Sequence, residues 1–538
     1  MSFILFASLG ALVYVFVTAY RSRKVVNDLR KQGMPMPTFS WLSGHMLVVK
    51  ENLEKFPIDA VHNYSFARMS QAFRKDKMFY LDFWPISTPF LVITNPYTAS
   101  QITQNVSAEK PEAVTSAFVA MTGGPNLLSM PEQQWKRWRS IFSPGFSPAH
   151  MLSQVPKIVE HTALFCKGLQ GLAQDGKLFQ LEEATFRLTL DVIGAVSLDA
   201  HFNYQTSENE FAERLRSIVE WTSFGGEINP FKRWNPLRPL AIWYNGRFLD
   251  KLIHAELDRR FAERKAALEK PTETGAKSVA SLALDNYIKD HVSAETESID
   301  PTFKLYATAQ IRMFLVAGHD TTSSAITYAF HLLYTNPTAL ASIRSEHDTV
   351  LGADPEVAGE MLSQDPGLLN QLPYTVAVIK EVLRLFPPAG GIRMGSSDIV
   401  LSTEDGNRYP TANCSVWILH GAIQRDPDYW PRPEEFLPER WLVGPDHELY
   451  PRVKGAWRPF ELGPKNCIGQ TLAMTEIKTV LAMTVRQFDM KPAYDEWDRL
   501  HPHAGIKAAN AERAYQVDGG GGGLHPANRY PCRVACRG

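Results

Sequence analysis

No charged residue occurs between positions 2 and 20 of this chain, where Phe, Ile, Leu, Val and Ala dominate. As a helix this run is about 28 Å long, which is close to the hydrocarbon thickness of a bilayer. Arg21, Arg23 and Lys24 follow the run, whereas a cleaved signal peptide carries its positive charge in front. The pattern predicts an uncleaved transmembrane signal-anchor over residues 1–24, and a buried core helix is the alternative.

The charges after the run also predict the orientation of the chain. Positive residues stay on the cytosolic side of a membrane, so we expect a single-pass protein of the endoplasmic reticulum with residues 2–20 in lipid and the rest in the cytosol. Residues 25–50 follow, and Pro35 and Pro37 make part of them non-helical. We expect either a stiff proline-containing linker ahead of a domain over 51–538 or the first turn of that domain.

Composition excludes several classes of function. Of the 538 residues, 44% are hydrophobic and 11% aromatic, enough to bury a large core, so the chain is not disordered. The 56 Lys and Arg against 57 Asp and Glu give a net charge of −1. Nucleic-acid binding needs a concentrated positive field, so we expect no nucleic-acid partner. Five cysteines are an odd number and favour a reducing compartment over a disulfide framework.

Helical periodicity dominates the body of the chain. We expect helices over 133–142, 151–173, 208–223, 247–269, 303–335, 369–386 and 467–488. Two β-like runs, at 78–94 and around 398–418, are broken by Pro, Gly and Asn. The polar stretch 270–300 predicts a surface connection, and the five glycines 519–523 predict a mobile loop. The predicted fold class is mainly α with a minor β component, in one domain.

Candidate chemistry concentrates around Cys467, which follows a Gly- and Pro-containing loop and opens an apolar-periodic helix. The N–H groups of a helix N-terminus stabilise a thiolate. Gly463 and Gly469 would let a flat ligand approach the backbone, and Phe460 would shield the sulfur. Zinc-ligand spacing to a second Cys or His is absent. A single thiolate suits a metal whose other ligands a porphyrin supplies, with a core cysteine or a nucleophile as alternatives.

This segment resembles the cytochrome P-450 haem-thiolate monooxygenases. "FELGPKNCIG" matches the family's Phe-x-x-Gly-x-x-x-Cys-x-Gly signature at Phe460, Gly463, Cys467 and Gly469. The resemblance implies the cytochrome P-450 fold with a single N-terminal transmembrane helix, and haem b (iron protoporphyrin IX) with Cys467 as the axial iron ligand. Lys465 stands where the family usually has Arg or His, and it can meet a haem propionate as a point charge.

A second family mark is a Glu-x-x-Arg pair, matched by Glu381 and Arg384 in "KEVLRLFPP". Residues three apart share one helix face, so the two side chains can interlock. The resemblance adds Arg440, in "FLPERW", as the third member of a buried structural cluster that holds the cysteine loop. The same spacing recurs in pairs that we interpret as solvated faces, namely Glu213/Arg216, Glu256/Arg259 and Glu496/Arg499.

A third mark is "FLVAGHDTTSSA", inside the long apolar stretch 303–335. Polar residues interrupt this stretch, and Gly318 costs a helix about 1 kcal/mol relative to alanine. The pattern predicts a local opening that holds water or a small ligand, or else a helix bend with satisfied hydroxyls. It matches the family's oxygen-activation motif, which implies Asp320 and Thr321 as catalytic residues that assist proton delivery.

Weaker matches complete the cofactor site. Trp135 and Arg139, in "EQQWKRWRSIF", resemble the Trp-x-x-x-Arg of the family's propionate-binding helix, and an ordinary amphipathic helix is the alternative. Arg393 is similar to a second propionate arginine. Gln424 replaces a histidine that is frequent in the family, and His420 is out of register. We therefore assign no propionate function to either of these two residues.

The resemblance implies a membrane-anchored monooxygenase that inserts one oxygen atom from O2 into a small apolar organic substrate. Its electrons come from NADPH through NADPH–cytochrome P-450 reductase. The ending "HPANRYPCRV" is similar to fungal microsomal members of specialised, or secondary-metabolite, biosynthesis. Desaturation, ring coupling or rearrangement at the same haem is the alternative reaction. A non-enzymatic, membrane-bound haem sensor is a remote alternative.

By analogy, we expect the substrate pocket near Phe314, Ala389–Ile392, the segment 111–127 and Tyr515. Basic residues also cluster near the cysteine loop and on the helix predicted over 133–142. They predict a docking surface for an acidic reductase, with a solvated charge run as the alternative for each of them. The residues are Lys136, Arg137, Lys454, Arg458 and Lys465.

Overall fold

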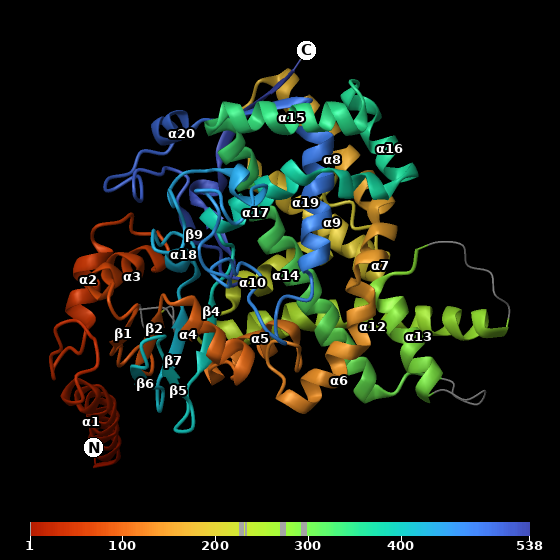
Figure 1. Ribbon diagram of the computed structural model, residues 1–538. Helices are drawn as coiled ribbons and strands as arrows, with labels where there is room; N and C mark the ends of the chain where they lie inside the picture. The colour runs from red at the N-terminus through yellow and green to blue at the C-terminus, as the bar shows by residue number, and fades with distance from the viewer. Residues whose placement is uncertain (1, 225–230, 232–233, 270–275, 292–297, 538) are drawn as a thin grey trace.

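The computed structural model describes residues 2–224, 231, 234–269, 276–291 and 298–537. Figure 1 shows a body built mostly of helices, with the short strands β1, β2, β5, β6 and β7 gathered beside α1 to α4. The expected class, mainly α with a minor β component, is confirmed.

The bounds of the elements follow in chain order. The α-helices are α1 (Ser2–Lys31), α2 (Met46–Leu53), α3 (Asn63–Ser70), α4 (Pro96–Ser100), α5 (Glu112–Thr122), α6 (Glu132–Phe142), α7 (Pro148–Ser153), α8 (Val155–Asp175), α9 (Leu181–Leu198), α10 (Glu210–Trp221), α12 (Leu237–Glu269), α13 (Val279–His291), α14 (Pro301–Thr335), α15 (Pro337–Leu351), α16 (Ala358–Gln364), α17 (Pro373–Leu385), α18 (His420–Ile423), α19 (Gln470–Thr484) and α20 (Tyr494–Leu500). The strands are β1 (Met78–Leu81), β2 (Phe90–Ile93), β3 (Phe179–Gln180), β4 (Gly391–Met394), β5 (Val400–Ser402), β6 (Arg408–Pro410), β7 (Ser415–Ile418), β8 (Phe488–Pro492), β9 (Gln516–Asp518), β10 (Leu524–Pro526) and β11 (Pro531–Cys536). Short 3₁₀ or π turns are η1 (Gln71–Phe73), η2 (Gln101–Asn105), η3 (Ser143–Phe146), η4 (Pro355–Val357), η5 (Pro366–Gln371), η6 (Pro438–Trp441) and η7 (Ala527–Arg529).

The helices predicted from periodicity are present with shifted ends. The helix expected from position 467 begins at Gln470 instead, which leaves Cys467 in the loop before α19. The polar stretch 270–300, expected as a surface connection, contains α13, and Val279 and Ala283 of that helix are buried. Its few apolar residues fall on one face, which the overall composition of the stretch concealed. Residues 270–275 and 292–297 lie outside the described part of the chain.

The largest sheet has the order β1-β2-β7-β4. β1 pairs antiparallel with β2, and β2 runs parallel to β7 with Leu91 opposite Val416. The run predicted at 78–94 forms β1 and β2, and the run around 398–418 forms β5, β6 and β7. β4 was not predicted, and it pairs with β7 so that Arg393 lies opposite Val416.

The segment 25–50 is packed against the body. α1 continues to Lys31, and its buried Arg23 pairs with buried Asp82 at 2.5 Å. The carbonyl of Pro35 accepts a hydrogen bond from the N–H of Tyr80 at 2.9 Å. These contacts attach both ends of the proline-containing stretch to the body of the protein.

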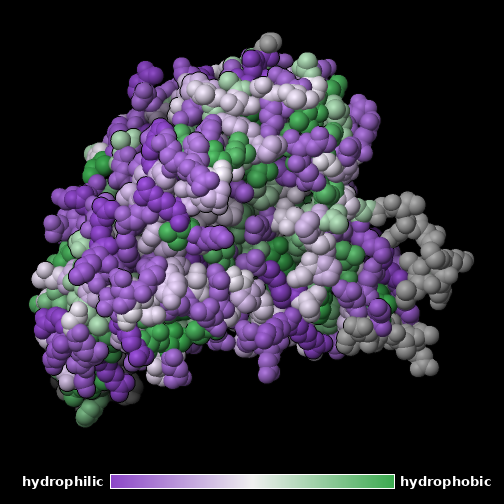
Figure 2. All heavy atoms as spheres, viewed as in Figure 1, coloured by the Kyte–Doolittle hydropathy of each residue, from purple (hydrophilic) through white to green (hydrophobic). Residues whose placement is uncertain are grey.

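The N-terminal part of α1 exposes apolar side chains. Phe6 is 70% exposed, Leu12 67% and Phe16 72%. In the view of Figure 2, hydrophobic atoms mark the tip where α1 projects. Among the described residues, no helix has the length and hydropathy that a membrane crossing requires.

α14 runs through the core against α9, α17 and α19 (Figure 1). Gly318 allows α9 to come close, because a Cβ there would lie 2.8 Å from Cγ1 of Ile193. The predicted local opening is not present, since α14 is one continuous helix from Pro301 to Thr335. The hydroxyl of Thr321 donates to the carbonyl of Ala317 at 2.9 Å, so the polar residues are accommodated without breaking the ladder.

Candidate functional site

Cys467 lies in a loop that its own main chain closes. The N–H of Cys467 donates to the carbonyl of Phe460 at 2.9 Å, which joins two residues of the signature. The cysteine is exposed, whereas α19 behind it is largely buried. The surrounding protein desolvates the thiol and raises its pKa, while the N–H of Gly469, the Arg139 guanidinium and the N–H of Gln470 act in the opposite direction. The sulfur thus lies near the N-terminus of α19, although Cys467 is in the loop before this helix and does not open it.

Glycine occurs at the two signature positions for different structural reasons. Gly463 has a φ of +97°, and a Cβ there would lie 2.3 Å from the carbonyl oxygen of Thr103. A positive φ and this close approach both require glycine, so the neighbouring backbone already explains Gly463. A Cβ on Gly469 would lie 3.9 Å from Sγ of Cys467, which is an ordinary contact. Gly469 therefore borders the sulfur itself.

α6 contributes the predicted Trp135 and Arg139. Nη1 of Arg139 donates to the carbonyl of Asn466 at 2.9 Å, and Nη2 donates to the side-chain oxygen of Asn466 at 3.0 Å. Nζ of Lys465 lies 5.8 Å from the ring centroid of buried Trp135 and 3.4 Å from a carboxylate oxygen of Glu132. The fold thus brings all three predicted residues of this group onto the cysteine loop.

Cations converge beside this loop. Arg393 is buried on β4 and donates to the carbonyl of Ile392 at 2.9 Å. Burial and the positive charges of Arg393 and Lys465 together lower the pKa of Lys110 to about 7, against the opposite effect of Glu461. Positive side chains that lie together away from water repel one another. An anionic group bound among them would relieve this repulsion and accept their hydrogen bonds. The two propionates of a haem fit this requirement.

Lys110 was missed by the sequence analysis. It precedes Pro111 and α5 in a segment without a motif. Its importance comes from its neighbours Arg393 and Lys465, which lie hundreds of positions later in the chain. No local signal indicated that contact.

The predicted cluster of Glu381, Arg384 and Arg440 is assembled. Nη2 of Arg384 lies 2.8 Å from Oε1 of Glu381, and Nε of Arg440 lies 2.9 Å from the same oxygen, with all three side chains fully buried. Nε1 of Trp441 donates to the other oxygen, Oε2, at 3.0 Å. The second positive charge is met by main-chain carbonyls, because Arg440 donates to the carbonyl of Pro431 at 2.8 Å. Buried charges are stable only when they are paired in this way.

Gln424, for which no function was assigned, joins this cluster to the cysteine loop. Its Nε2 donates to the carbonyls of Leu383 at 3.0 Å and Arg384 at 2.9 Å. Its Oε1 accepts from the N–H of Arg458 at 2.9 Å. A neutral amide can donate and accept at the same time, so it fits between main-chain carbonyls on one side and a main-chain N–H on the other.

Pairs with the Glu-x-x-Arg spacing elsewhere behave differently from one another. Glu256 and Arg259 bond to each other at the surface, with Nε of Arg259 2.9 Å from a Glu256 oxygen. At the other two pairs Glu213 and Arg499 are exposed, as expected for solvated faces, but the second member of each pair bonds to a residue outside the pair. Arg216 donates instead to Glu183 at 2.8 Å, and Glu496 accepts from Arg533 at 2.9 Å. Tertiary packing supplied partners that the local spacing does not reveal.

Three further residues lie elsewhere than expected. Phe314 packs in the core between two aromatic rings whose centroids lie 5.1 and 5.0 Å away. Tyr515 is buried, and its hydroxyl donates to Asp59 at 2.7 Å. Arg458 is fully buried, and its Nε donates to Glu461 at 2.9 Å. Phe314 and Tyr515 therefore do not present a pocket surface, and Arg458 cannot dock a partner. Exposed basic residues remain at Lys136, Arg137 and Lys454.

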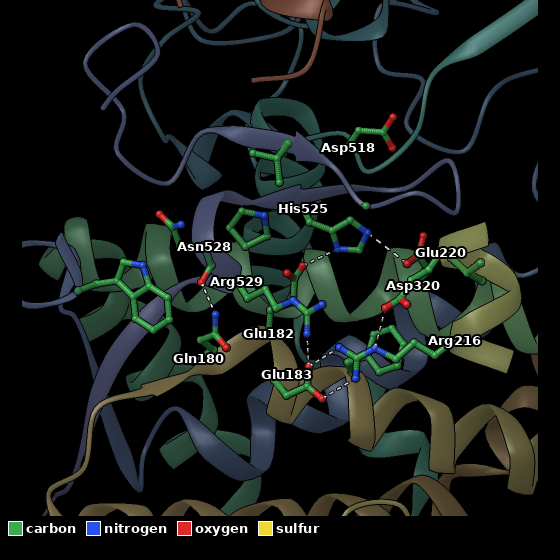
Figure 3. Close-up of a pocket in the computed structure, with 16 residues that line it drawn as sticks. Gln180, Glu182, Glu183, Arg216, Glu220, Asp320, Asp518, His525, Asn528 and Arg529 are labelled. Atoms are coloured by element: carbon green, nitrogen blue, oxygen red, sulfur yellow. Dashed lines mark hydrogen bonds and ion pairs between the residues drawn. The ribbon is translucent and has the colours of Figure 1, made fainter. Parts of the chain in front are cut away.

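Asp320 and Thr321 are neighbours on α14 with different surroundings. Thr321 is half-buried and Ala317, one turn earlier, is exposed, so this face of α14 is open. Asp320 is 4% exposed, and its Oδ1 lies 3.2 Å from Nε2 of His525. Nδ1 of His525 lies 2.6 Å from Oε1 of Glu182 on α9 (Figure 3). The sequence analysis identified neither His525 nor Glu182.

Electrostatics in this cluster favour the charged forms of His525 and Asp320. Burial opposes a charge on His525, but Glu182 and Asp320 raise its pKa well above the usual range. Burial likewise opposes ionisation of Asp320, and the charge of His525 nevertheless holds the pKa of that carboxyl below its usual value. For Glu182, desolvation prevails and raises the pKa.

Comparison with known proteins agrees with these features. The family model for cytochrome P450 matches residues 34–517. Cytochrome P450 monooxygenase polC of Polytolypa hystricis is 38% identical over 520 residues, which cover 96% of this chain and 92% of that protein. Cytochrome P450 monooxygenase acrF of Aspergillus aculeatus is 32% identical over 485 residues, with coverages of 86% and 95%.

The fold is likewise similar to a solved cytochrome P450DA heme domain. The TM-score is 0.70 at 20% identity, over 94% of this chain and 98% of that one. The family model and the two relatives extend over most of the sequence, including the cysteine loop and the cluster around Glu381. The chain therefore belongs to the cytochrome P450 family of monooxygenase enzymes.

Proposed function

We propose that this cytochrome P450 is a membrane-anchored haem-thiolate monooxygenase that inserts one oxygen atom from O2 into a small apolar organic substrate. The observation that carries the proposal is the exposed sulfur of Cys467, in a loop that the N–H of Cys467 closes on the carbonyl of Phe460. A thiolate so placed fits axial ligation of iron. Lys110 and Arg393 fit the propionates of haem b, because their charges lack enough acidic partners.

With haem bound, the thiolate-ligated iron supplies the oxygen-activating chemistry. The chain's own residues position that chemistry. Arg139 holds the loop before Cys467, and Thr321 presents a hydroxyl on the open face of α14. Asp320 is the neighbouring acid through which a proton is delivered. NADPH provides two electrons through NADPH–cytochrome P450 reductase, and the second oxygen atom leaves as water.

The location that we propose is the cytosolic face of the endoplasmic reticulum membrane, with residues 1–24 as the anchor. Exposed apolar side chains such as Phe6 and Phe16, followed by Arg21 and Lys24, support it. Residues 25–50 would connect the anchor to the catalytic domain, which we assign to residues 51–538. The fungal source of both relatives supports a substrate from secondary metabolism.

Reconstitution tests the proposal. The full chain, purified with haem and embedded in lipid vesicles with the reductase and NADPH, is supplied with 18O2 and the metabolite that accumulates when the gene is deleted. We expect a product that carries one 18O atom and a reduced carbon-monoxide spectrum typical of a thiolate ligand. A product two hydrogens lighter without 18O would instead favour desaturation or coupling. NADPH consumption without any product would favour a haem sensor.

A further inference from the structure

A pocket of about 320 Å³, lined by both charged and apolar side chains, lies beside Asp320. Its walls come from α9, α10, α14, the β9–β10 hairpin and η7 (Figure 3). The outer lining includes the exposed residues Glu220, Asp518 and Arg529, and the inner lining includes buried His525. The pocket therefore joins solvent to the acid of the oxygen-activation motif, from a side away from the open face of Thr321.

His525 is the link between the pocket and Asp320. Its Nδ1 lies 2.6 Å from Oε1 of Glu182, and its Nε2 lies 3.2 Å from Oδ1 of Asp320. Nδ1 of the imidazole is thus hydrogen-bonded to one carboxylate, and Nε2 faces a second carboxylate, from a different helix, at an ion-pair distance. An imidazole in this arrangement holds a proton on each nitrogen and can give up the one on Nε2.

The glycines 519–523 form the turn of the β9–β10 hairpin and close over this acid. A Cβ on Gly523 would lie 2.1 Å from Oδ2 of Asp320 and 3.1 Å from Nε2 of His525. The N–H of Gly523 also acts on Asp320 and lowers its pKa. From the sequence, this segment was expected to be a mobile loop. Its backbone instead contacts Asp320, and a side chain at position 523 would prevent that contact.

We propose that His525 is a positioning residue that supplies the proton of Asp320, and that the pocket admits this proton from solvent. The inference rests on the proposed function. The Nε2 proton passes to Oδ1 of Asp320, and the neutral imidazole takes a new proton from water in the pocket. Glu182 stabilises the imidazolium before the transfer and again after the ring has regained a proton. The net result is one proton moved from solvent to Asp320, with no change in the electrons of either residue.

The charges around the imidazole keep a proton on the ring, so that His525 rests as an imidazolium beside a carboxylate. Burial would favour the neutral ring, but two carboxylates raise the pKa of His525 well above the usual range. The nearby arginines do not oppose this charge strongly, because Arg216 and Arg529 are both paired with Glu183. The charged or titratable groups on the surrounding elements are Glu182 and Glu183 on α9, Arg216 and Glu220 on α10, His319 and Asp320 on α14, Asp518 on β9, and Arg529 on η7.

The test compares His525→Gln with wild type in the full, haem-loaded chain reconstituted with reductase. The matched control is His331→Gln. His331 is a buried residue of α14, and its Nε2 lies 3.0 Å from a carboxylate oxygen of Glu512. We expect normal haem content and a normal carbon-monoxide spectrum in both variants. Product per NADPH should fall at least about 10-fold in His525→Gln, since a positioned proton donor contributes about 10²–10⁴-fold to its step. The solvent deuterium isotope effect should rise in that variant alone.

A second readout does not depend on turnover. Because the folded pKa of His525 is raised, its contribution to stability is complete below pH 6.5, the ordinary pKa of histidine, and is lost as the pH rises through the folded value. The gap in unfolding midpoint between wild type and His525→Gln should therefore be widest near pH 6 and shrink in alkaline buffer. A gap that does not change with pH would show that His525 is not the charged group and would overturn the inference.

The remaining outcomes separate this inference from the proposed function. Wild-type coupling in His525→Gln, with product formed, would overturn the proton-supply role and leave the monooxygenase intact. Equal losses in His525→Gln and His331→Gln would reduce His525 to a structural ion pair. A wild-type protein that forms no product would refute the proposed function and, with it, the proton path.

Discussion

Arg139 donates twice to Asn466, to its main-chain carbonyl at 2.9 Å and to its side-chain oxygen at 3.0 Å. Asn466 directly precedes Cys467, so the guanidinium on α6 sets the position of the loop that carries the sulfur. From the sequence, Arg139 was expected only as a partner of a propionate. The structure adds a second task that depends on the fork shape of arginine.

Arg139→Lys should therefore loosen the cysteine loop although it keeps the charge. Lysine cannot make the two parallel bonds, and hydrogen bonds to charged groups are worth about 1.5–3 kcal/mol each. We expect faster haem loss and a smaller thiolate-type carbon-monoxide signal. The control is Arg137→Lys, at an exposed position of the same helix. Equal haem retention in both variants would contradict a task in holding the loop.

Cys467→Ala should remove the thiolate spectrum and stop turnover, because the sulfur ligand is lost. The other four cysteines serve as controls. Burial raises the pKa of Cys166 and of Cys414 to about 12, so both are thiols at neutral pH. Alanine at Cys166, Cys414, Cys532 or Cys536 should leave the spectrum unchanged. Its loss in one of these four variants, with folding intact, would overturn the assignment of the ligand.

Thr321→Ala removes the hydroxyl that donates to Ala317 but little volume. Haem content should survive, NADPH use should continue, hydrogen peroxide should rise and product per NADPH should fall. Thr335→Ala is the control, because the Thr335 hydroxyl makes the same kind of bond, to the carbonyl of His331 at 3.0 Å. Product, peroxide and NADPH are measured together. Unchanged coupling in Thr321→Ala would indicate that the hydroxyl serves only the helix.

Glu381→Gln should destabilise the fold severely. Two fully buried arginines would lose their shared carboxylate, and breaking such a pair costs about 3–5 kcal/mol. We expect this fall in the free energy of unfolding, measured by urea titration. The control is Glu54→Gln, at an exposed pair with Lys50, where the loss should stay within about 1 kcal/mol. Similar losses in the two variants would contradict the structural importance of the cluster.

Removal of residues 1–20 should release much of the protein from membranes and leave haem binding intact. This cut keeps Arg23, which pairs with buried Asp82. Removal of residues 1–24 should release the protein as well but should also lower its unfolding midpoint, because Asp82 would lose its partner. Flotation with vesicles and thermal unfolding measure the two effects. Full membrane retention of both truncated chains would contradict the proposed anchor.

Several features of the site were predictable because they are local. The spacing of Glu381 and Arg384 places both on one helix face, and the pattern around Cys467 places it beside a helix N-terminus. The contact of Arg440 with this pair was predicted by resemblance and is present. The burial of Arg458 was not predicted. The sequence of a loop does not distinguish an arginine that faces solvent from one that bonds to a glutamate inside the protein.

By itself the sequence determined the mainly helical class, the position of the cysteine loop and the identity of the residues on α14, since periodicity and short spacings report which residues share a face. Only the tertiary structure placed Lys110 beside Arg393 and brought His525 to Glu182, 343 positions away. The physical reason is that these polar side chains interact across packed elements, by repulsion between Lys110 and Arg393 and by pairing between His525 and Glu182. Such pairing depends on how the apolar faces dock, and no local pattern records it.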